Sequence, residues 1–345
     1  MTTETSERDR LRDAAAVVGQ VMSLCGRLGL RQSRIFLSRF ACKPVSYYKW
    51  FRFLIEYRRR HGLGRPHDDL LRKKPYKFLA LGLSGHRGVD LLAGHFELAA
   101  AGMPRDRLEA AWRGRPMDLG LVGGRRDAYA LTMRLSVHSG TSHEGAFSIK
   151  LTRQSDRLDL VKLSFILYPL DQDDVSLNRH PDPTPSWSMN FSGKPVPAFR
   201  DPAPGCNRYT VAVGGLQGSR EARAKRAVVD ATRDMCGLRP KDAALLVMEG
   251  IAIGGGAHHL LGVSDARHTI NFRASAKRAR KRADMDQYWI DRGGLEGGEF
   301  GFAIPLRNRE ITEPFSRRDF YKAEFLEIGK GLFARSADPA TPGAA

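Results

Sequence analysis

Several features that would assign this chain to a structural class are missing from its sequence. It has four cysteines, Cys25, Cys42, Cys206 and Cys236, which are scattered and form no C-x-x-C pair. This spacing argues against a zinc site and against a disulfide framework. No apolar run is long enough to span a bilayer, and the opening MTTETSERDRLRD is polar where a signal peptide needs an apolar core. We therefore expect a cytoplasmic protein with no metal.

Acidic residues are also scarce relative to basic ones. The chain of 345 residues has 56 Lys and Arg against 38 Asp and Glu, a formal net charge of +18. Such a balance favours an anionic ligand or an anionic membrane surface as partner, and the inner face of the inner membrane would provide one. The alternative is an Arg-rich composition that simply follows a GC-rich genome. The hydrophobic content of 42% is sufficient for a packed core.

Residues 1–78 are predicted to form a basic, aromatic helical extension. Within YYKWFRFLIEYRRR, Trp50, Phe51, Leu54 and Tyr57 recur at helical spacing, and Arg58–Arg60 follow them. This pattern is typical of a helix that packs against a core. It is also compatible with a helix that lies on an anionic membrane, and the sequence alone leaves both interpretations open.

Residues 79–335 are predicted to form an α+β domain, followed by a disordered tail over 336–345. After a helix at about 87–101, on which His95 faces the core, four strands are expected at 128–137, 145–151, 159–168 and 209–213. Short links make these strands an antiparallel meander. Helices and strands then alternate, because glycines and prolines divide the remaining residues into short segments.

Several segments in order resemble the VirK/YbjX family of bacterial proteins. They are GHRGVDLLAGHFEL, HEGAFSIKL, VGGLQG, GLRPKDAALLV, LGVSDARHTI, and DQYWIDRGG followed by FGFAIPL. The resemblance covers about residues 70–330 and implies a role in virulence, envelope integrity or stress response. It supplies no biochemical activity. The chain departs from the family at Ala146, where an acidic residue is usual, and in a longer proline-rich loop before VGGLQG.

The part from about 128 to 306 also looks like the GNAT acyltransferase fold. In that superfamily the turn after the fourth strand binds the pyrophosphate of acyl-coenzyme A (acyl-CoA) through backbone amides. Here Gln217, Gly218, Ser219 and Arg220 occupy that turn, and Lys225 follows on the next helix. Arg220 stands where the superfamily has glycine, so it would bind phosphate with its side chain. A plain structural turn, or a turn that binds another phosphate ligand, remains an alternative.

The same resemblance implies a set of catalytic residues for acyl transfer. Tyr288 occupies the place of the tyrosine that protonates the departing thiolate. Glu144, which follows the polar loop SGTSH and begins a strand, and His268 are the candidate general bases. Each of these side chains could equally be a packing or hydrogen-bonding residue.

A different class of function is left open by the basic segments. The run RASAKRARKR at 273–282, together with Arg58–Arg60, would suit a non-catalytic adaptor that binds anionic lipid or nucleic acid during stress. Since no aromatic residue interrupts the run and no recognition motif is present, specific DNA recognition is not expected. The sequence identifies no protein partner.

Overall fold

The structure is a computed structural model. It describes residues 2–136, 142–170, 208–219, 221, 223–272, 284–306 and 316–333, and the side chains from residue 11 onward. The predicted tail at 336–345 and the whole basic run at 273–282 lie outside these residues. No helix among the described residues has the length and apolar character needed to cross a membrane.

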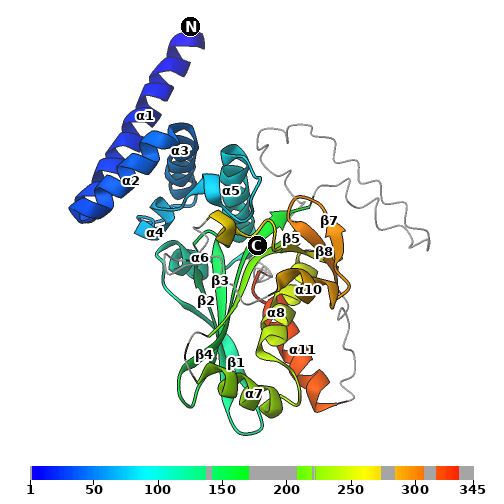
Figure 1. The fold of residues 1–345 in the computed structure, drawn as a ribbon. Coiled ribbons are helices and arrows are strands. Elements are labelled where there is room, and N and C mark those ends of the chain that lie inside the picture. The colour runs from blue at the N-terminus through cyan, green and yellow to red at the C-terminus, as the bar shows by residue number, and fades with distance from the viewer. Residues whose placement is uncertain are drawn as a thin grey trace, which may run out of the picture.

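The N-terminal part is helical and packs on α5 (Figure 1). Its elements are α1 (Thr2–Arg27), α2 (Leu30–Cys42), α3 (Pro44–Arg60), α4 (Asp68–Leu71), the 3-10 turn η1 (Pro75–Lys77), α5 (Gly85–Gly102) and α6 (Arg105–Trp112). Trp50, Phe51, Leu54 and Tyr57 are fully buried, and the Trp50 indole donates to Leu70 O. The aromatic stripe of α3 therefore faces the core, as one of the two sequence interpretations predicted.

One sheet of eight strands occupies the centre of the molecule, in the order β1-β2-β3-β4-β5-β6-β8-β7. The strands are β1 (Met117–Gly123), β2 (Ala128–Leu135), β3 (Phe147–Arg153), β4 (Leu158–Pro169), β5 (Tyr209–Gly218), β6 (His259–Val263), β7 (Leu295–Gly297) and β8 (Gly301–Pro305). All neighbours are antiparallel except β5 and β6, which pair in parallel only at Ala212–Leu261 and Val213–Gly262. The predicted α+β class and meander are confirmed, while β1 and β7 were not predicted.

Three helices cover the apolar face of the sheet; in Figure 1 two of them, α8 and α11, lie to its right and α7 lies at its lower end. They are α7 (Ala224–Asp234), α8 (Pro240–Gly254) and α11 (Arg317–Lys330); η3 (Thr269–Phe272) and α10 (Met285–Ile290) complete the elements. Tyr129 and Leu131 of β2 point to this face, which fits strict alternation along a strand. Tyr129 reaches the end of α7, where its hydroxyl donates to Asp234 at 2.8 Å.

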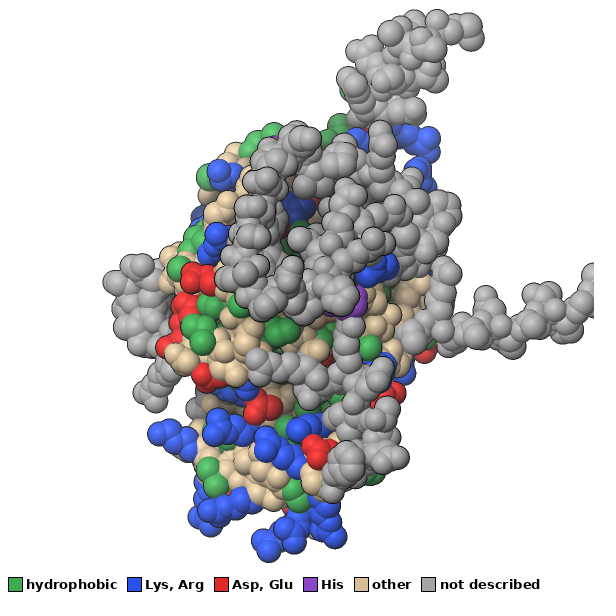
Figure 2. Space-filling model, turned by 90° about the vertical axis from the view of Figure 1, so that its right-hand side faces the viewer, with side chains coloured by type: hydrophobic (Ala, Val, Ile, Leu, Met, Phe, Trp, Pro, Cys, Tyr) green, Lys and Arg blue, Asp and Glu red, His purple; other side chains and the backbone are tan. Residues whose placement is uncertain are grey.

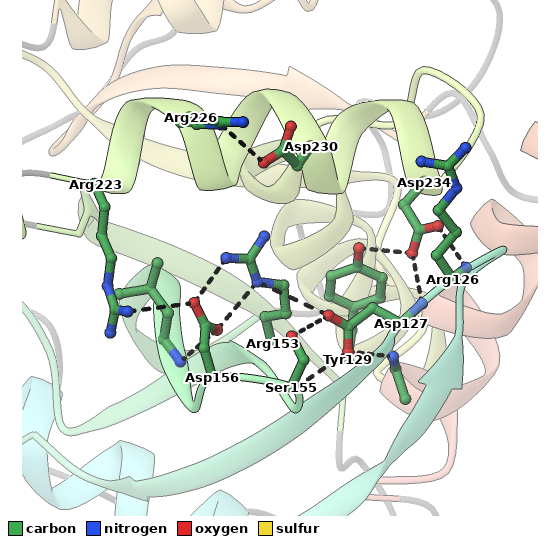
Figure 3. Close-up of polar contacts among 12 residues, drawn as sticks. Arg126, Asp127, Tyr129, Arg153, Ser155, Asp156, Arg223, Arg226, Asp230 and Asp234 are labelled. Atoms are coloured by element: carbon green, nitrogen blue, oxygen red, sulfur yellow. Dashed lines mark hydrogen bonds and ion pairs between the residues drawn. The ribbon is translucent and has the colours of Figure 1, made fainter.

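A polar network fastens α7 to the turns that follow β1 and β3 (Figure 3). The Asp234 carboxylate accepts hydrogen bonds from the amides of Arg126 and Asp127 as well as from Tyr129. In the second turn, Arg153 pairs with Asp156 at 2.7 Å. The acidic side chains at the α7 end of the molecule are therefore directed inward. There they accept the hydrogen bonds of backbone amides and of the buried Tyr129 hydroxyl, which would otherwise need water as acceptor.

Candidate functional site

The second face of the sheet is polar over its middle strands. Cross-strand partners share a face, and the register pairs Thr132 with Lys150, Lys150 with Lys162, and Lys162 with Gln217. The next row pairs Arg134, Ser148, Ser164 and Gly215 in the same way. We call these two rows the polar face. Ser148 and Ser164 are buried on it, and their hydroxyls are 3.2 Å apart.

A buried lysine holds the loop that lies over one end of the polar face. The Lys73 ammonium donates to the carbonyls of Ser136, Ser142 and Gly145 at 2.7–3.0 Å. Burial lowers the pKa of Lys73 to about 7. Three carbonyl dipoles replace the water that this cation loses, so Lys73 fixes the loop on both sides of Glu144.

The carboxylate of Glu144, a residue that is only 5% exposed, is the centre of a three-residue cluster. The side-chain amide of Gln217 donates to it, with Nε2 2.9 Å from each oxygen. His268 Nε2 lies 4.0 Å from Oε1. His268 Nδ1 accepts the amide of Ile270, so a neutral ring carries its proton on Nε2, the nitrogen that faces Glu144.

The glycines of VGGLQG are explained by this cluster. A Cβ at Gly214 would clash with the backbone oxygen of Glu144, and one at Gly215 would clash with its carboxylate. A Cβ at Gly218 would meet nothing within 4 Å. Gly214 and Gly215 therefore leave the space that Glu144 occupies. This role differs from the phosphate-binding turn that the sequence suggested.

Backbone strain accompanies the same loop. Leu79 is buried and has a φ of 64°, the left-handed region that is costly for a residue with a side chain. Its amide donates to His143 O at 2.7 Å, next to Glu144, and the following Ala80 forms a bridge with His268. Segments from three parts of the sequence thus meet at the cluster, and the surrounding contacts hold Leu79 in an unfavourable conformation.

Two further cations of the polar face lie close to the cluster. The pKa of Lys162 is lowered to about 8, chiefly by burial and then by the charge of Arg134, while the charge of Glu144 opposes the shift. Arg134 Nε is buried and has no hydrogen-bond partner among the described residues. Lys150, by contrast, forms an ion pair with Asp159 at 2.6 Å.

Tyr288 lies away from this cluster, against α8. Its hydroxyl is 3.4 Å from Lys241 O and 3.3 Å from Asp242 Oδ1, and the Arg292 guanidinium lies 3.4 Å from its ring centroid. Burial raises the pKa of Tyr288. Since α8 covers the apolar face, the structure does not bring Tyr288 together with Glu144.

The turn after β5 offers few free amides in the described residues. The Ser219 amide donates to Leu160 O, and the Glu221 amide donates to Ser219 Oγ. Lys225 is exposed on α7, and Arg220 lies outside the described residues. The described part of this turn therefore fits an amide cradle for pyrophosphate poorly.

The sequence predictions missed Lys73, Arg134 and Lys162. For the last two a signal was present, because the positions that alternate with Leu131, Met133 and Leu135 are Thr132, Arg134 and Ser136. The same polar alternation occurs on β3 and β4. Lys73 carried no such signal, since its partners are carbonyls that are 63–72 residues away in sequence.

The segment GHRG at the start of α5 is joined to Glu299, just before β8, by an ion pair. Arg87, in the α5 segment GHRG, donates two hydrogen bonds of 2.7 Å to the Glu299 carboxylate, and a third to the Tyr168 hydroxyl. Arg87, Glu299 and Arg267 line an open depression beside residues 81–84. Since the acid and both bases are engaged with protein groups, this contact stabilises the fold.

Comparison with known proteins gives one match. The family described as "Protein of unknown function (DUF535)" matches residues 29–175 and 203–323, which together are most of the chain. No curated protein and no solved structure matches significantly. The matched ranges contain the Glu144 loop, β5 with Gln217, and His268. The chain belongs to the DUF535 family, which corresponds to VirK/YbjX.

Proposed function

We propose that the protein is an acyltransferase that uses acyl-CoA and has Glu144 as its general base. One observation carries the proposal: Glu144, Gln217 and His268 meet on the polar face at the point where β5 loses its parallel partner β6. A carboxylate oriented by an amide and facing an imidazole N–H is an arrangement suited to proton transfer.

In this reaction Glu144 accepts the proton of an amine or hydroxyl as that group attacks the thioester carbonyl. A carbon–nitrogen or carbon–oxygen bond forms, the carbon–sulfur bond breaks, and the thiolate takes a proton from water. The sequence assigned the acid role to Tyr288. We favour water as the acid, because Tyr288 does not lie on the same side of the sheet as Glu144 and a neutral His268 ring, whose Nδ1 accepts an amide, is too weak an acid.

The course of β5 supports the GNAT-like part of the proposal. Its register on β4 shifts between Val213 and Gly215, and beyond Val213 no described strand pairs with its β6 side. A strand edge without a partner strand can pair with the amides of an extended ligand, and the pantetheine arm of acyl-CoA carries two. The donor would then approach this edge at Gln217 and Gly218, which reach the surface, with its phosphates bound elsewhere than on the amides of Ser219 and Glu221.

The biological setting follows from the family resemblance and is equally a proposal. It consists of an envelope-related acceptor, a role in virulence or stress response, and a cytoplasmic location at the inner membrane. None of these follows from the geometry of the site.

Calorimetry with coenzyme A, followed by an assay of thiol release from acetyl-CoA, tests the proposal. The wild type should bind, and Glu144→Gln should lower the rate by a factor of about 10² to 10⁴ while binding persists. Glu296→Gln, a change of an exposed glutamate on β7, is the matched control and should leave the rate unchanged. No heat at millimolar coenzyme A would refute the use of this donor.

A second candidate function is an adaptor for an anionic surface, and the end of the molecule at α7 favours it. Figure 2 shows Lys and Arg side chains gathered at the bottom of the molecule, where Figure 1 places α7. The exposed basic residues of α7 and the adjoining turns are Arg125, Arg126, Arg157, Arg223, Lys225, Arg226 and Arg233. We call them the basic end.

Charge segregation makes the basic end attractive to phosphate groups. Asp127, Asp156 and Asp234 are used inside the network of Figure 3, so the outer surface keeps an excess of cations. Flotation with vesicles of anionic or neutral lipid tests this function. Changing Lys225, Arg226 and Arg233 to Gln should abolish binding to anionic vesicles, whereas the same change at Arg31, Arg34 and Lys43 should not. Binding to nucleic acid but not to vesicles would contradict the lipid partner.

A further inference from the structure

The polar face holds two cations that have no ion-pair partner among the described residues. Arg134 and Lys162 are both half-buried, and the buried Nε of Arg134 lacks a hydrogen bond there. The neighbouring Lys150 differs, since Asp159 neutralises it at 2.6 Å. Cations withdrawn from water without a partner are costly in a folded protein, so an anion bound between them would be stabilised.

The two cations act on each other as well as on the solvent. Lys162 feels the charge of Arg134 more strongly than that of any other residue, and this charge works against its protonation. Glu144 is close enough to favour the protonated form, but its two oxygens already accept from Gln217. The Glu144 carboxylate therefore does not remove the repulsion between Arg134 and Lys162, and an anionic ligand bound near both would reduce it.

The position of the cations relative to Glu144 decides which ligand they serve. Lys162 is the cross-strand partner of Gln217, which holds Glu144. An anionic group bound to Lys162 therefore lies near the general base, whose charge acts on Lys162. In acyl-CoA the phosphates are far from the thioester carbon, so this group belongs to the acceptor.

We propose that the acceptor is a phosphate ester that carries an amine or a hydroxyl. Its phosphate binds between the Arg134 guanidinium and the Lys162 ammonium, which places the nucleophile next to Glu144. A fork of N–H groups together with a second cation suits the doubly charged tetrahedral phosphate better than a single carboxylate. The role given to the nucleophile rests on the proposed function. The binding of phosphate to Arg134 and Lys162 is independent of it.

Binding of inorganic phosphate and of 2-aminoethyl phosphate, measured by calorimetry on the full chain, tests the inference. Arg134→Gln and Lys162→Gln should each weaken both ligands by about tenfold or more. Arg31→Gln, the same change at an exposed site on α2, should leave the affinity within about twofold and controls for net charge. Lys162→Arg keeps the positive charge and should retain the affinity. This result would show that the loss in Lys162→Gln comes from the missing charge and not from misfolding.

The outcomes separate this inference from the proposed function. If the polar face binds phosphate and acyl-CoA does not bind, the site stands and the acyltransferase is refuted. If acyl transfer occurs to ethanolamine as readily as to 2-aminoethyl phosphate, the phosphate site is refuted. Equal phosphate affinity in the wild type and in the Arg134 and Lys162 variants would refute it as well.

Discussion

Gly215 lies directly against the carboxylate of Glu144, with no space for a methyl group between them. The strand that provides Gln217 as a hydrogen-bond donor thus also provides, two residues earlier, the space that the acceptor occupies. The family segments HEG and VGGLQG are complementary parts of a single contact. This relationship allows Glu144 to be displaced without changing its own side chain.

Gly215→Ala should displace the Glu144 carboxylate and abolish acyl transfer or ligand binding at the polar face. It should also lower the free energy of unfolding by about 1–3 kcal/mol, since the added methyl group meets packed atoms. Gly218→Ala is the matched control, because its Cβ would point into open space. Urea unfolding and the activity assay, run on both variants, should show the effect only at residue 215. Equal behaviour of the two variants would contradict the contact.

Lys73→Met should release the loop that carries Glu144. The carbonyls of Ser136, Ser142 and Gly145 would lose their common donor, and unsatisfied buried acceptors cost about 1–3 kcal/mol each. We expect faster amide exchange at residues 142–146 together with a lower melting temperature. Lys49→Met, at an exposed lysine on α3, should change neither by a comparable amount. Unchanged exchange in the Lys73 variant would show that the loop is held by other contacts.

The buried His95 should make the protein less stable in acid. Burial lowers its pKa from 6.5 to about 3, and Nδ1 accepts the amide of Leu167. Between pH 6.5 and 3 the unfolded chain binds a proton that the folded chain does not, so stability falls as the pH decreases through this range. His95→Gln should reduce this slope in urea unfolding measured across the range. His86→Gln, at an exposed histidine on α5, should leave it unchanged.

Binding of an anion at the polar face should weaken in alkaline solution. The pKa of Lys162 is lowered to about 8, so the ammonium loses its proton as the pH rises through that value. Sulfate is a suitable probe, because it keeps its charge throughout. Its affinity should fall between pH 7 and 9 in the wild type and stay nearly constant in Lys162→Arg. The same fall in both proteins would assign the titration to another group.

Asp234→Ala should destabilise the fold without affecting the polar face. It removes the acceptor of the Tyr129 hydroxyl and of two backbone amides, at a cost of about 2–4 kcal/mol. Asp230→Ala on the same helix is the control, since Asp230 is exposed and lies 4.0 Å from Arg226. Urea midpoints should separate the two variants, whereas phosphate affinity in the folded state should be the same in both.

Local patterns were sufficient to predict much of the fold. The alternation of Tyr129, Leu131 and Met133 identified β2, and the spacing of Trp50 and Tyr57 identified α3. The strand β1 was missed because Gly120 and Gly123 interrupt its alternation, and β7 was missed because it has three residues, all exposed.

The site was predictable only in part, for a physical reason. Glu144, Gln217 and His268 were each singled out from their own segments, and the structure brings them together. What no local pattern contains is which face of the sheet a distant helix covers. That is why Tyr288 was grouped with Glu144, although α8 places it on the other side. The same limit hid Lys73, whose role depends entirely on carbonyls far along the chain.

The short parallel contact between β5 and β6 has a consequence for how the chain folds. β1 pairs with β2 and β3 with β4 across short turns, and β2 pairs with β3 across the segment 136–146, so these hairpins can close early. The parallel pair must instead bring residue 212 to residue 261, after α7 and α8 have formed, and it offers only two residue pairs in return. Closing such a loop costs conformational entropy before any contact compensates for it. We therefore expect the addition of β6, β8 and β7 to be the slow step of folding, and the Glu144 cluster, which needs His268 from beyond β6, to be completed last.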